Sequence, residues 1–199
     1  MKLYGSITSP FVRRIRFLCL ELGIPFTMVD TMTEAGQKEL REKNPLWKVP
    51  YAEINDVKIW DSHTIIDYLF ETKGFGNFRP KAGPHHYREA NLQTAIDQAL
   101  DNAILIFYLN KEGIKPDAAP YLTKNALRIS SILDYIKREL NGHFFFTDGK
   151  VGLSEIALYT TLDWIRFRSV LPVEEDPVFA GFLNFHGQNK SWKETAPKQ

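Results

Sequence analysis

Apolar residues in the first 75 positions follow two different spacings. Short apolar runs at residues 2–5, 26–29, 51–54 and 57–60 predict strands. Helical spacing predicts helices over residues 11–22 and from residue 62 to near Gly74, with a short polar helix over residues 37–43. A helix between the first two strands predicts a parallel pair, and Asn55-Asp56 predicts a tight turn between the last two. The first part of the chain is therefore expected to mix strands and helices.

The pattern changes after residues 74–84, which are dense in glycine and proline. Beyond them only helical spacing remains, over residues 87–112, 118–140 and 152–167, with a shorter helix from Asp176-Pro177 and a polar tail over residues 190–199. The 152–167 helix is the most apolar and should form the core of this part. The 118–140 helix is expected to bury Leu127, Ile132, Leu133 and Ile136. These patterns predict an N-terminal domain over residues 1–75, a linker over 76–86 and an all-helical domain over 87–199.

Composition narrows the class of protein. The chain has 199 residues, of which 44% are hydrophobic and 25% charged, enough to bury a substantial core. A net charge of +1 gives no indication of nucleic acid or of an anionic membrane surface as a partner. No apolar run approaches the roughly 20 residues that span a bilayer. The single cysteine, Cys19, excludes an intramolecular disulfide and a multi-thiolate metal site. A cytoplasmic protein is expected.

Two short stretches of the sequence indicate what the protein binds, which composition alone does not show. Val49-Pro50 stands between a predicted helix and a predicted strand, where a cis bond would leave the Val49 N–H and C=O facing outward to pair with an extended peptide. Asp61-Ser62 starts a predicted helix, whose free N–H groups and partial positive charge favour an anion. Together they favour a small peptide that carries carboxylates.

These stretches, in their order and spacing, resemble the glutathione S-transferase family over essentially the whole chain. Ser9-Pro10-Phe11 resembles the start of the first helix in its serine-type members (theta-, tau- and bacterial-like cytosolic forms), and Asn44-Pro45 with Val49-Pro50 and Asp61-Ser62 resembles its glutathione motifs. The resemblance implies an α/β N-terminal thioredoxin-like domain (βαβαββα) plus an all-α C-terminal helical domain. It also implies glutathione as co-substrate, no tightly bound cofactor, no metal and a homodimer.

The chain departs from the family pattern at two places. Residues 152–157 resemble the capping box that begins the family's central C-terminal helix, but Gly152 replaces the usual Ser or Thr and Glu155 the usual Asp. Since glycine still caps a helix tolerably, we expect a modest loss of stability. Trp47 stands where glycine is common and is expected to narrow or line the substrate entrance.

The resemblance implies a role for each residue of the site. Ser9 would donate a hydrogen bond to the glutathione sulfur and stabilise the thiolate, which is the nucleophile. Lys48 would face the glycyl carboxylate, and Val49, held by Pro50, would pair with the cysteinyl backbone. Asp61 would accept from the α-ammonium group and Ser62 would hold the α-carboxylate. The candidates for the hydrophobic substrate pocket are Phe11, Trp47, Phe107, Tyr108 and Trp164.

Several residues have a simpler structural interpretation. Ser9 could be only a cap, with Ser6 and Thr8 as rival hydroxyls. Tyr4 lies mid-strand and is expected in the core, as is Cys19, which argues against disulfide exchange through a protein thiol. Arg13, Arg14 and Arg16 lie off the apolar stripe and are expected on a solvated face. The histidines His63, His85 and His86 are expected at the surface or at helix starts, without metal spacing. Asp97 and Asp101 belong either to a solvated face or, by resemblance, near the partner subunit's glutathione.

The function expected from this pattern is conjugation of glutathione to a small hydrophobic electrophile. The alternative is a non-catalytic protein that binds glutathione or a hydrophobic ligand, or a regulatory protein, on the same fold. Peroxidase or isomerase activity would use the same thiolate.

Overall fold

The computed structural model describes residues 1–80, 83 and 85–198 of the chain. Its contacts divide these residues into two compact units. Met1–Gly76 and the C-terminal residues from Gly187 onward form the first unit, and Asn77–His186 form the second.

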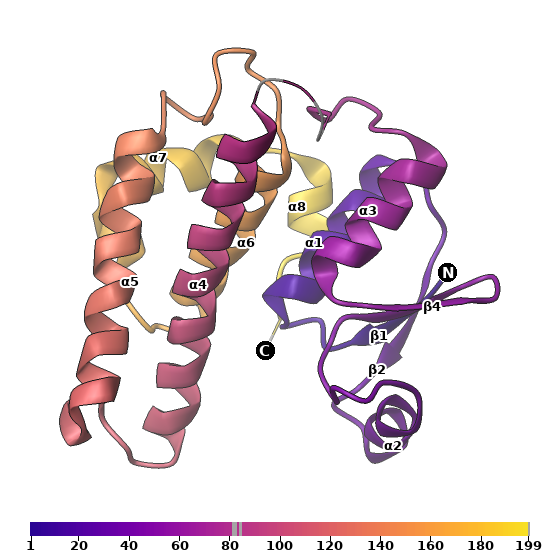
Figure 1. Cartoon of the computed structure of the whole chain (residues 1–199), viewed down its shortest axis with the longest axis horizontal. Coiled ribbons are helices and arrows are strands. Elements are labelled where there is room, and N and C mark those ends of the chain that lie inside the picture. Colours follow the sequence, from indigo (N-terminus) through magenta and orange to yellow (C-terminus); the bar gives the residue numbers. More distant parts are fainter. Residues whose placement is uncertain (81–82, 84, 199) are drawn as a thin grey trace. The chain divides into compact units, whose positions relative to one another are not determined.

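The first unit is a four-stranded sheet between two layers of helices. Its order is β1 (Lys2–Gly5), α1 (Pro10–Glu21), β2 (Thr27–Asp30), α2 (Glu34–Lys43), β3 (Tyr51–Ile54), β4 (Val57–Trp60) and α3 (Ser62–Lys73), which confirms the predicted βαβαββα order. The strands lie in the order β2-β1-β3-β4, with β1 and β2 parallel as predicted and β3 antiparallel to both neighbours. Helices α1 and α3 cover one face of the sheet, and α2 lies on the other (Figure 1).

Alternation along the strands builds a core on each face of the sheet. On the face that α2 covers, Tyr4, Leu40 and Tyr51 form a cluster against which Val29 and Val49 pack. On the other face, α1 lies very close to β1: a Cβ added at Gly5 would lie 2.3 Å from a methyl group of Val12. Glycine at the end of β1 therefore allows α1 to approach the sheet.

The arginines of α1 correct one expectation. Arg13 and Arg14, expected on a solvated face, are only 3% and 1% exposed. The C-terminal helix α8 (Lys190–Glu194) covers this part of α1, and the Trp192 ring stacks on Phe17 at 3.5 Å. The Arg13 guanidinium donates to the Trp192 carbonyl at 3.0 Å, across 179 positions of sequence. The pattern within α1 could not reveal this partner.

The tail was expected to be a polar end of the helical domain. Its contacts instead group the residues from Gly187 onward with the first unit. Arg16 donates to the Thr195 carbonyl at 3.1 Å, and Asn189 donates to Glu21 at 3.2 Å. The first unit is thus built from both ends of the chain.

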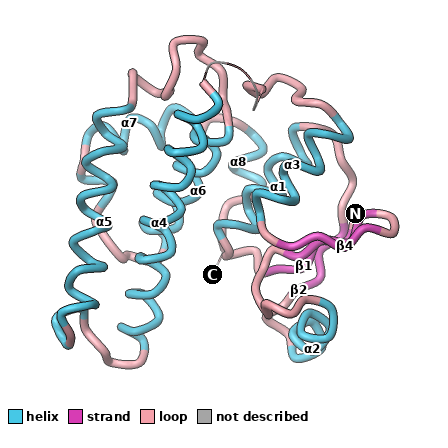
Figure 2. Tube along the Cα trace, viewed as in Figure 1, coloured by secondary structure: helices cyan, strands magenta, loops and turns pink. Residues whose placement is uncertain are grey.

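The second unit consists of helices and loops. Its elements are α4 (His86–Lys111), the 3-10 helix η1 (Pro116–Ala118), α5 (Pro120–Glu139), α6 (Leu153–Phe167), the 3-10 helix η2 (Val173–Glu175) and α7 (Pro177–His186). Figure 2 shows the named strands confined to the first unit. Helix α4 packs against α5 and α6, and α6 also packs against α7. Nearly every residue of α6 is buried, which confirms it as the core of this unit. Among the described residues, no helix has both the length and the hydropathy of a bilayer-spanning segment.

The buried stripe of α5 differs from the expected one. Leu127 is 66% exposed, whereas Ile129, Leu133 and Ile136 are buried. Leu127 precedes Leu133 by six positions, so at about 100° per residue the two side chains point about 120° apart around the helix, and Leu127 lies off the buried stripe. The stripe is instead continued through Asn125 and Ile129.

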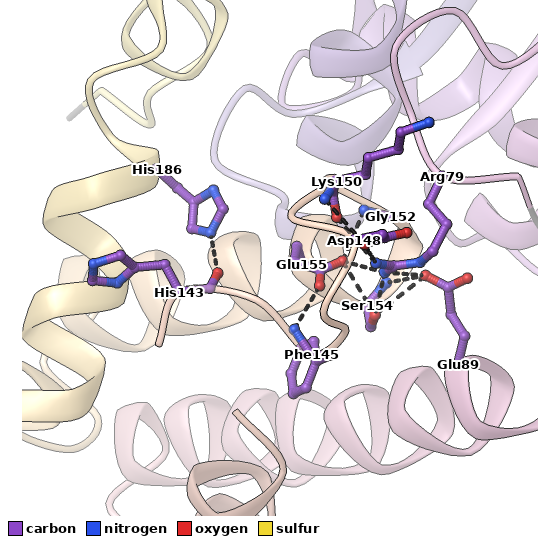
Figure 3. Close-up of polar contacts among 10 residues, drawn as sticks. All are labelled: Arg79, Glu89, His143, Phe145, Asp148, Lys150, Gly152, Ser154, Glu155 and His186. Carbon is purple, nitrogen blue, oxygen red and sulfur yellow. Dashed lines mark hydrogen bonds and ion pairs between the residues drawn. The ribbon is translucent and has the colours of Figure 1, made fainter. Parts of the chain in front are cut away.

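A buried ion network explains the glycine at the start of α6 (Figure 3). The Arg79 guanidinium lies 2.9 Å from Glu89 of α4 and 2.6 Å from Glu155 of α6, and all three side chains are at most 4% exposed. A Cβ added at Gly152 would lie 2.2 Å from the Arg79 Nη2 atom and 2.3 Å from the Glu89 carboxylate. There is no room for a serine or threonine cap.

The Glu89 carboxylate accepts hydrogen bonds at this helix start, as the side chain of a serine or threonine cap would do. It accepts the Ser154 backbone N–H at 3.4 Å and the Ser154 hydroxyl at 3.2 Å. Glu155 accepts the Gly152 N–H at 2.7 Å, as in a capping box. Arg79, which the sequence places in the linker, also donates its backbone N–H to Val151. Residues 81, 82 and 84 of the predicted linker lie outside the described residues.

Candidate functional site

The loops that carry the expected site leave the same end of the sheet. In the register, Tyr4 pairs with Tyr51, and Tyr51 pairs with Trp60. The loop to Ser9 follows β1, the Asn44–Pro50 loop enters β3, and Asp61 follows β4. Because neighbouring strands lie about 4.8 Å apart, these three chain segments start within roughly 10 Å of one another. The first unit therefore gathers segments that are far apart in sequence.

Ser9 stands at the start of α1. It is the N-cap, and its Oγ accepts the Val12 N–H at 3.3 Å, while Pro10 occupies the first helical turn. The cap bond uses an acceptor lone pair of the hydroxyl and leaves its hydrogen to donate. The cap interpretation and the thiolate interpretation of Ser9 are therefore compatible.

The rival hydroxyls of this loop bind each other. The Ser6 and Thr8 hydroxyl oxygens are 2.9 Å apart, and the Thr8 N–H also donates to Ser6 Oγ at 3.1 Å. Ser6 is buried, whereas Ser9 is half-buried. This pairing favours Ser9 as the hydroxyl that faces a ligand.

The Asn44–Pro50 loop ends in a cis Val49-Pro50 bond, as the sequence predicts. The Val49 side chain packs against the Tyr4–Leu40–Tyr51 cluster. In the part of the chain that the structure describes, the Val49 backbone N–H and C=O make no hydrogen bond to another residue. Lys48 beside it is exposed. The loop therefore offers a backbone donor and acceptor next to a cation.

Trp47 lies at the tip of this loop with a positive φ of 54° and a 64% exposed side chain. A positive φ is the reason that glycine suits this position. The Arg41 guanidinium of α2 covers the Trp47 ring at 5.3 Å. The indole therefore lies against α2.

Asp61 and Ser62 begin α3. The Asp61 carboxylate accepts the His63 N–H at 2.8 Å, and its backbone has φ 74° and ψ 134°. Such a conformation is costly for a residue with a side chain and persists where the surrounding structure holds it. The Ser62 hydroxyl makes no hydrogen bond to another described residue, although the residue is only 2% exposed. Both residues offer polar groups at a helix N-terminus.

Comparisons with known proteins concern the first unit and the fold of the chain. Residues 3–80 match the family described as "Glutathione S-transferase, N-terminal domain". An uncharacterized GST-like protein of Escherichia coli (strain K12), YibF, is 27% identical over 173 residues, which cover 86% of this chain and 85% of YibF. A glutathione S-transferase of Methylobacterium radiotolerans in complex with glutathione sulfonate has a TM-score of 0.86 at 22% identity, covering 100% of this chain and 95% of its own.

A second solved structure, a glutathione S-transferase of Methylobacillus flagellatus with GSH bound, has a TM-score of 0.85 at 22% identity over 99% of both chains. These structures share the whole fold, a thioredoxin-like part followed by helices. The family match covers the β1-to-α3 unit that gathers the three loops.

The chain is similar to the glutathione S-transferase family, through the family match over residues 3–80 and through the fold of these solved structures.

Tyr4 and Cys19, which could take part in other reactions of glutathione S-transferases, are both buried. Tyr4, as predicted, lies in the core, and its hydroxyl is 2.7 Å from both Glu39 and the Lys43 ammonium. Cys19 is also buried, and burial raises the pKa of its thiol to about 12. A thiol with so high a pKa is almost wholly protonated near neutral pH, so the packing role expected for Cys19 holds.

The five aromatic side chains proposed to bind the hydrophobic substrate are divided between the two units. Phe11 and Trp47 belong to the first unit, and Phe11 lies under the Arg14 guanidinium at 4.8 Å. In the second unit, the Phe107 ring contacts Tyr108 at 5.3 Å and Trp164 at 5.6 Å. Trp164 is buried and Tyr108 is exposed.

The histidines lie where the sequence predicts. His63 is in the first turn of α3, and His85 and His86 are at the start of α4. Among the described residues, no three His, Cys, Asp or Glu side chains gather in a way that could hold a metal ion.

Proposed function

We propose that the protein is a glutathione transferase that conjugates glutathione to a small hydrophobic electrophile. Ser9 stabilises the glutathione thiolate, and the thiol proton leaves to solvent. The sulfur then attacks an electrophilic carbon, a carbon–sulfur bond forms, and the leaving group departs with its electron pair. The observation that supports this is the half-buried Ser9 hydroxyl at the start of α1, beside the loops of Val49 and Asp61.

The energies of such a site are sufficient for thiolate formation. A free thiol has a pKa of about 8.5 and is only a few per cent ionised at pH 7. A hydrogen bond from Ser9 to the charged sulfur contributes roughly 1.5–3 kcal/mol, which lowers the thiol pKa by about one to two units. The N-terminus of α1 adds about 0.3–1 kcal/mol. Together these two contributions lower the thiol pKa to roughly 6–7, so that about half or more of the bound thiol is ionised at pH 7 without a metal or a general base.

The charges of glutathione match the remaining groups. The exposed Lys48 faces the glycyl carboxylate, and the unpaired Val49 backbone binds the cysteinyl unit. Asp61 accepts from the α-ammonium group, and the Ser62 hydroxyl and N–H hold the α-carboxylate. The hydrophobic electrophile lies against aromatic side chains, for which the proposed candidates are Phe11, Trp47, Phe107, Tyr108 and Trp164.

Two further parts of the proposal concern the whole protein. We expect a homodimer, because the resemblance implies one, and sedimentation should give about twice the chain mass of 23.0 kDa. A mass of one chain at assay concentrations would contradict it. We also predict a cytoplasmic location, because the chain has a single cysteine. Fractionation of the source cells would check this prediction.

The competing proposal is a protein that binds glutathione, or another hydrophobic ligand, without turnover. Calorimetric titration of glutathione, together with the ultraviolet absorbance of the thiolate across pH, separates the two. A transferase should bind glutathione and lower its thiol pKa by about one to two units. Binding without a change in the thiol pKa would favour the binding protein.

Ser9→Ala tests the catalytic residue. We expect glutathione affinity to be largely kept while the bound thiol pKa rises toward its free value and conjugation falls at least tenfold. Since the substitution also removes a helix cap, Thr33→Ala is the matched control: Thr33 caps α2 through Gly36 N–H at 3.1 Å in the same unit. If both variants lose activity equally, Ser9 acts only as a cap.

A further inference from the structure

One buried side chain organises the loop before Val49. Asn44 is 1% exposed, and its Nδ2 donates to the Lys48 carbonyl at 2.8 Å. Its Oδ1 accepts the Leu46 N–H at 3.0 Å, and its backbone carbonyl accepts the Trp47 N–H at 3.1 Å. The three residues that lead to Val49 are therefore bound to Asn44.

Asn44 is itself fixed to the sheet through the end of α2. Its N–H donates to the Leu40 carbonyl at 2.8 Å, and Leu40 lies in the Tyr4–Leu40–Tyr51 cluster. The preceding Lys43 ammonium is 2.9 Å from Glu53 of β3 and 2.7 Å from the Tyr4 hydroxyl. The loop therefore has a rigid support at its start, and the packed Val49 side chain holds its other end.

A helix-capping role does not account for these bonds. Asn44 follows α2 in an extended conformation, with φ −118° and ψ 113°, rather than in the left-handed one in which asparagine ends helices. Both polar atoms of its side chain bind the loop that follows, and in the described chain neither binds α2. The side chain therefore acts on the loop.

We propose that Asn44 is a positioning residue that makes the site selective for the glycyl end of glutathione. Asn44 holds the Lys48 carbonyl, and so sets where the Lys48 ammonium and the Val49 backbone meet the ligand. This inference rests on the proposed glutathione site. Asp61 and Ser62, which hold the γ-glutamyl end in that proposal, lie on α3, and Asn44 makes no hydrogen bond to them in the described chain.

The test compares two ligands that differ only at that end. Glutathione and γ-glutamylcysteine, which lacks the glycine, are titrated by calorimetry into the wild type, Asn44→Ala, Asn44→Asp and a matched control, Asn110→Ala, at an exposed position of α4. The wild type should prefer glutathione. Asn44→Ala should lower the affinity for glutathione about tenfold and the affinity for γ-glutamylcysteine less than about twofold. The difference is expected because roughly one net hydrogen bond is lost at the glycyl end.

Asn44→Asp keeps the acceptor for the Leu46 N–H but places an oxygen against the Lys48 carbonyl. Its preference for glutathione over γ-glutamylcysteine should therefore fall at least as much as that of Asn44→Ala. Retained γ-glutamylcysteine binding shows that each variant is folded. Equal weakening of both ligands, or unchanged glutathione binding by Asn44→Ala, would overturn the inference. Equal affinity of the wild type for both ligands would overturn it while leaving the glutathione site intact. A wild type that binds neither would overturn the proposed function itself.

Discussion

At the scale of single residues, backbone conformation and close contacts constrain the chain most clearly in three places. Trp47 and Asp61 have positive φ values although both carry side chains, and each stands in a loop of the candidate site. Strain of this kind persists where the surrounding structure holds it, as at ligand-binding loops. Gly152 shows the converse, since neighbouring side chains occupy the space beside it.

We predict that Gly152→Ser destabilises the protein, although serine is ordinarily the better helix cap. The new Cβ would lie 2.2 Å from Arg79 and 2.3 Å from Glu89, so the buried ion network must shift. Overpacking of this kind costs about 1–3 kcal/mol, which urea unfolding would measure.

The matched control is Gly181→Ala in α7, where the nearest atom to a new Cβ is 3.7 Å away. This change should be neutral or stabilising by about 0.5–1 kcal/mol, since alanine favours helices. A stabilised Gly152→Ser would show that Arg79 and Glu89 move aside without cost.

At the scale of elements, the end of α7 is joined to the loop before α6. The Nε2 atom of the buried His186 ring is 2.7 Å from the His143 carbonyl oxygen (Figure 3). The same ring lies 4.4 Å from the Phe182 ring. Burial lowers the pKa of His186, opposed by its hydrogen bond to His143. The folded protein therefore favours the neutral imidazole.

This predicts a loss of stability in mild acid. Below the ordinary histidine pKa of about 6.5 the unfolded chain takes up a proton that folded His186 does not, so the free energy of unfolding falls as pH decreases. The slope from one histidine is at most about 1.4 kcal/mol per pH unit. It ends below the folded pKa, where both states are protonated.

Denaturant unfolding between pH 7.5 and 5 should show this slope in the wild type and a shallower one in His186→Phe. Val178→Ala, which changes a 40% exposed residue of the same helix without removing a titratable group, is the control and should keep the wild-type slope. An unchanged slope in His186→Phe would assign the pH dependence to other groups.

At the scale of the whole molecule, the two ends of the chain fold together. Trp192 is 2% exposed, stacks on Phe17 of α1 and accepts a hydrogen bond from Arg13. Arg16 of α1 also donates a hydrogen bond to the Thr195 carbonyl of this tail, and Ser9 caps the same helix. The last residues are therefore part of the unit that holds the candidate site.

We predict that Trp192→Ala lowers the stability of the first unit by about 3–5 kcal/mol, the usual cost of truncating a buried tryptophan. Hydrogen exchange should lose protection over residues 1–76 before residues 77–186. Trp60→Ala, at a 39% exposed position of β4, should cost much less. Equal loss of protection in both units would contradict the grouping of the tail with the first.

The sequence alone determined the order of elements and the place of the candidate loops. The spacing of apolar residues is a local property, so it predicted the βαβαββα unit, the parallel pair and the helical second part. The short motifs around Ser9, Val49 and Asp61 lie at element ends that local rules also place. These motifs are therefore enough to indicate a resemblance to the glutathione S-transferase family.

Only the tertiary structure decided which polar residues are buried and what they bind. Arg13 is buried against a tail whose Trp192 is 179 positions away, and Gly152 is enclosed by Arg79 and Glu89 from other segments. The role of Asn44 likewise depends on the conformation of the loop that follows it. Burial and hydrogen bonding depend on partners brought together by folding, and residue spacing within one element carries no information about those partners.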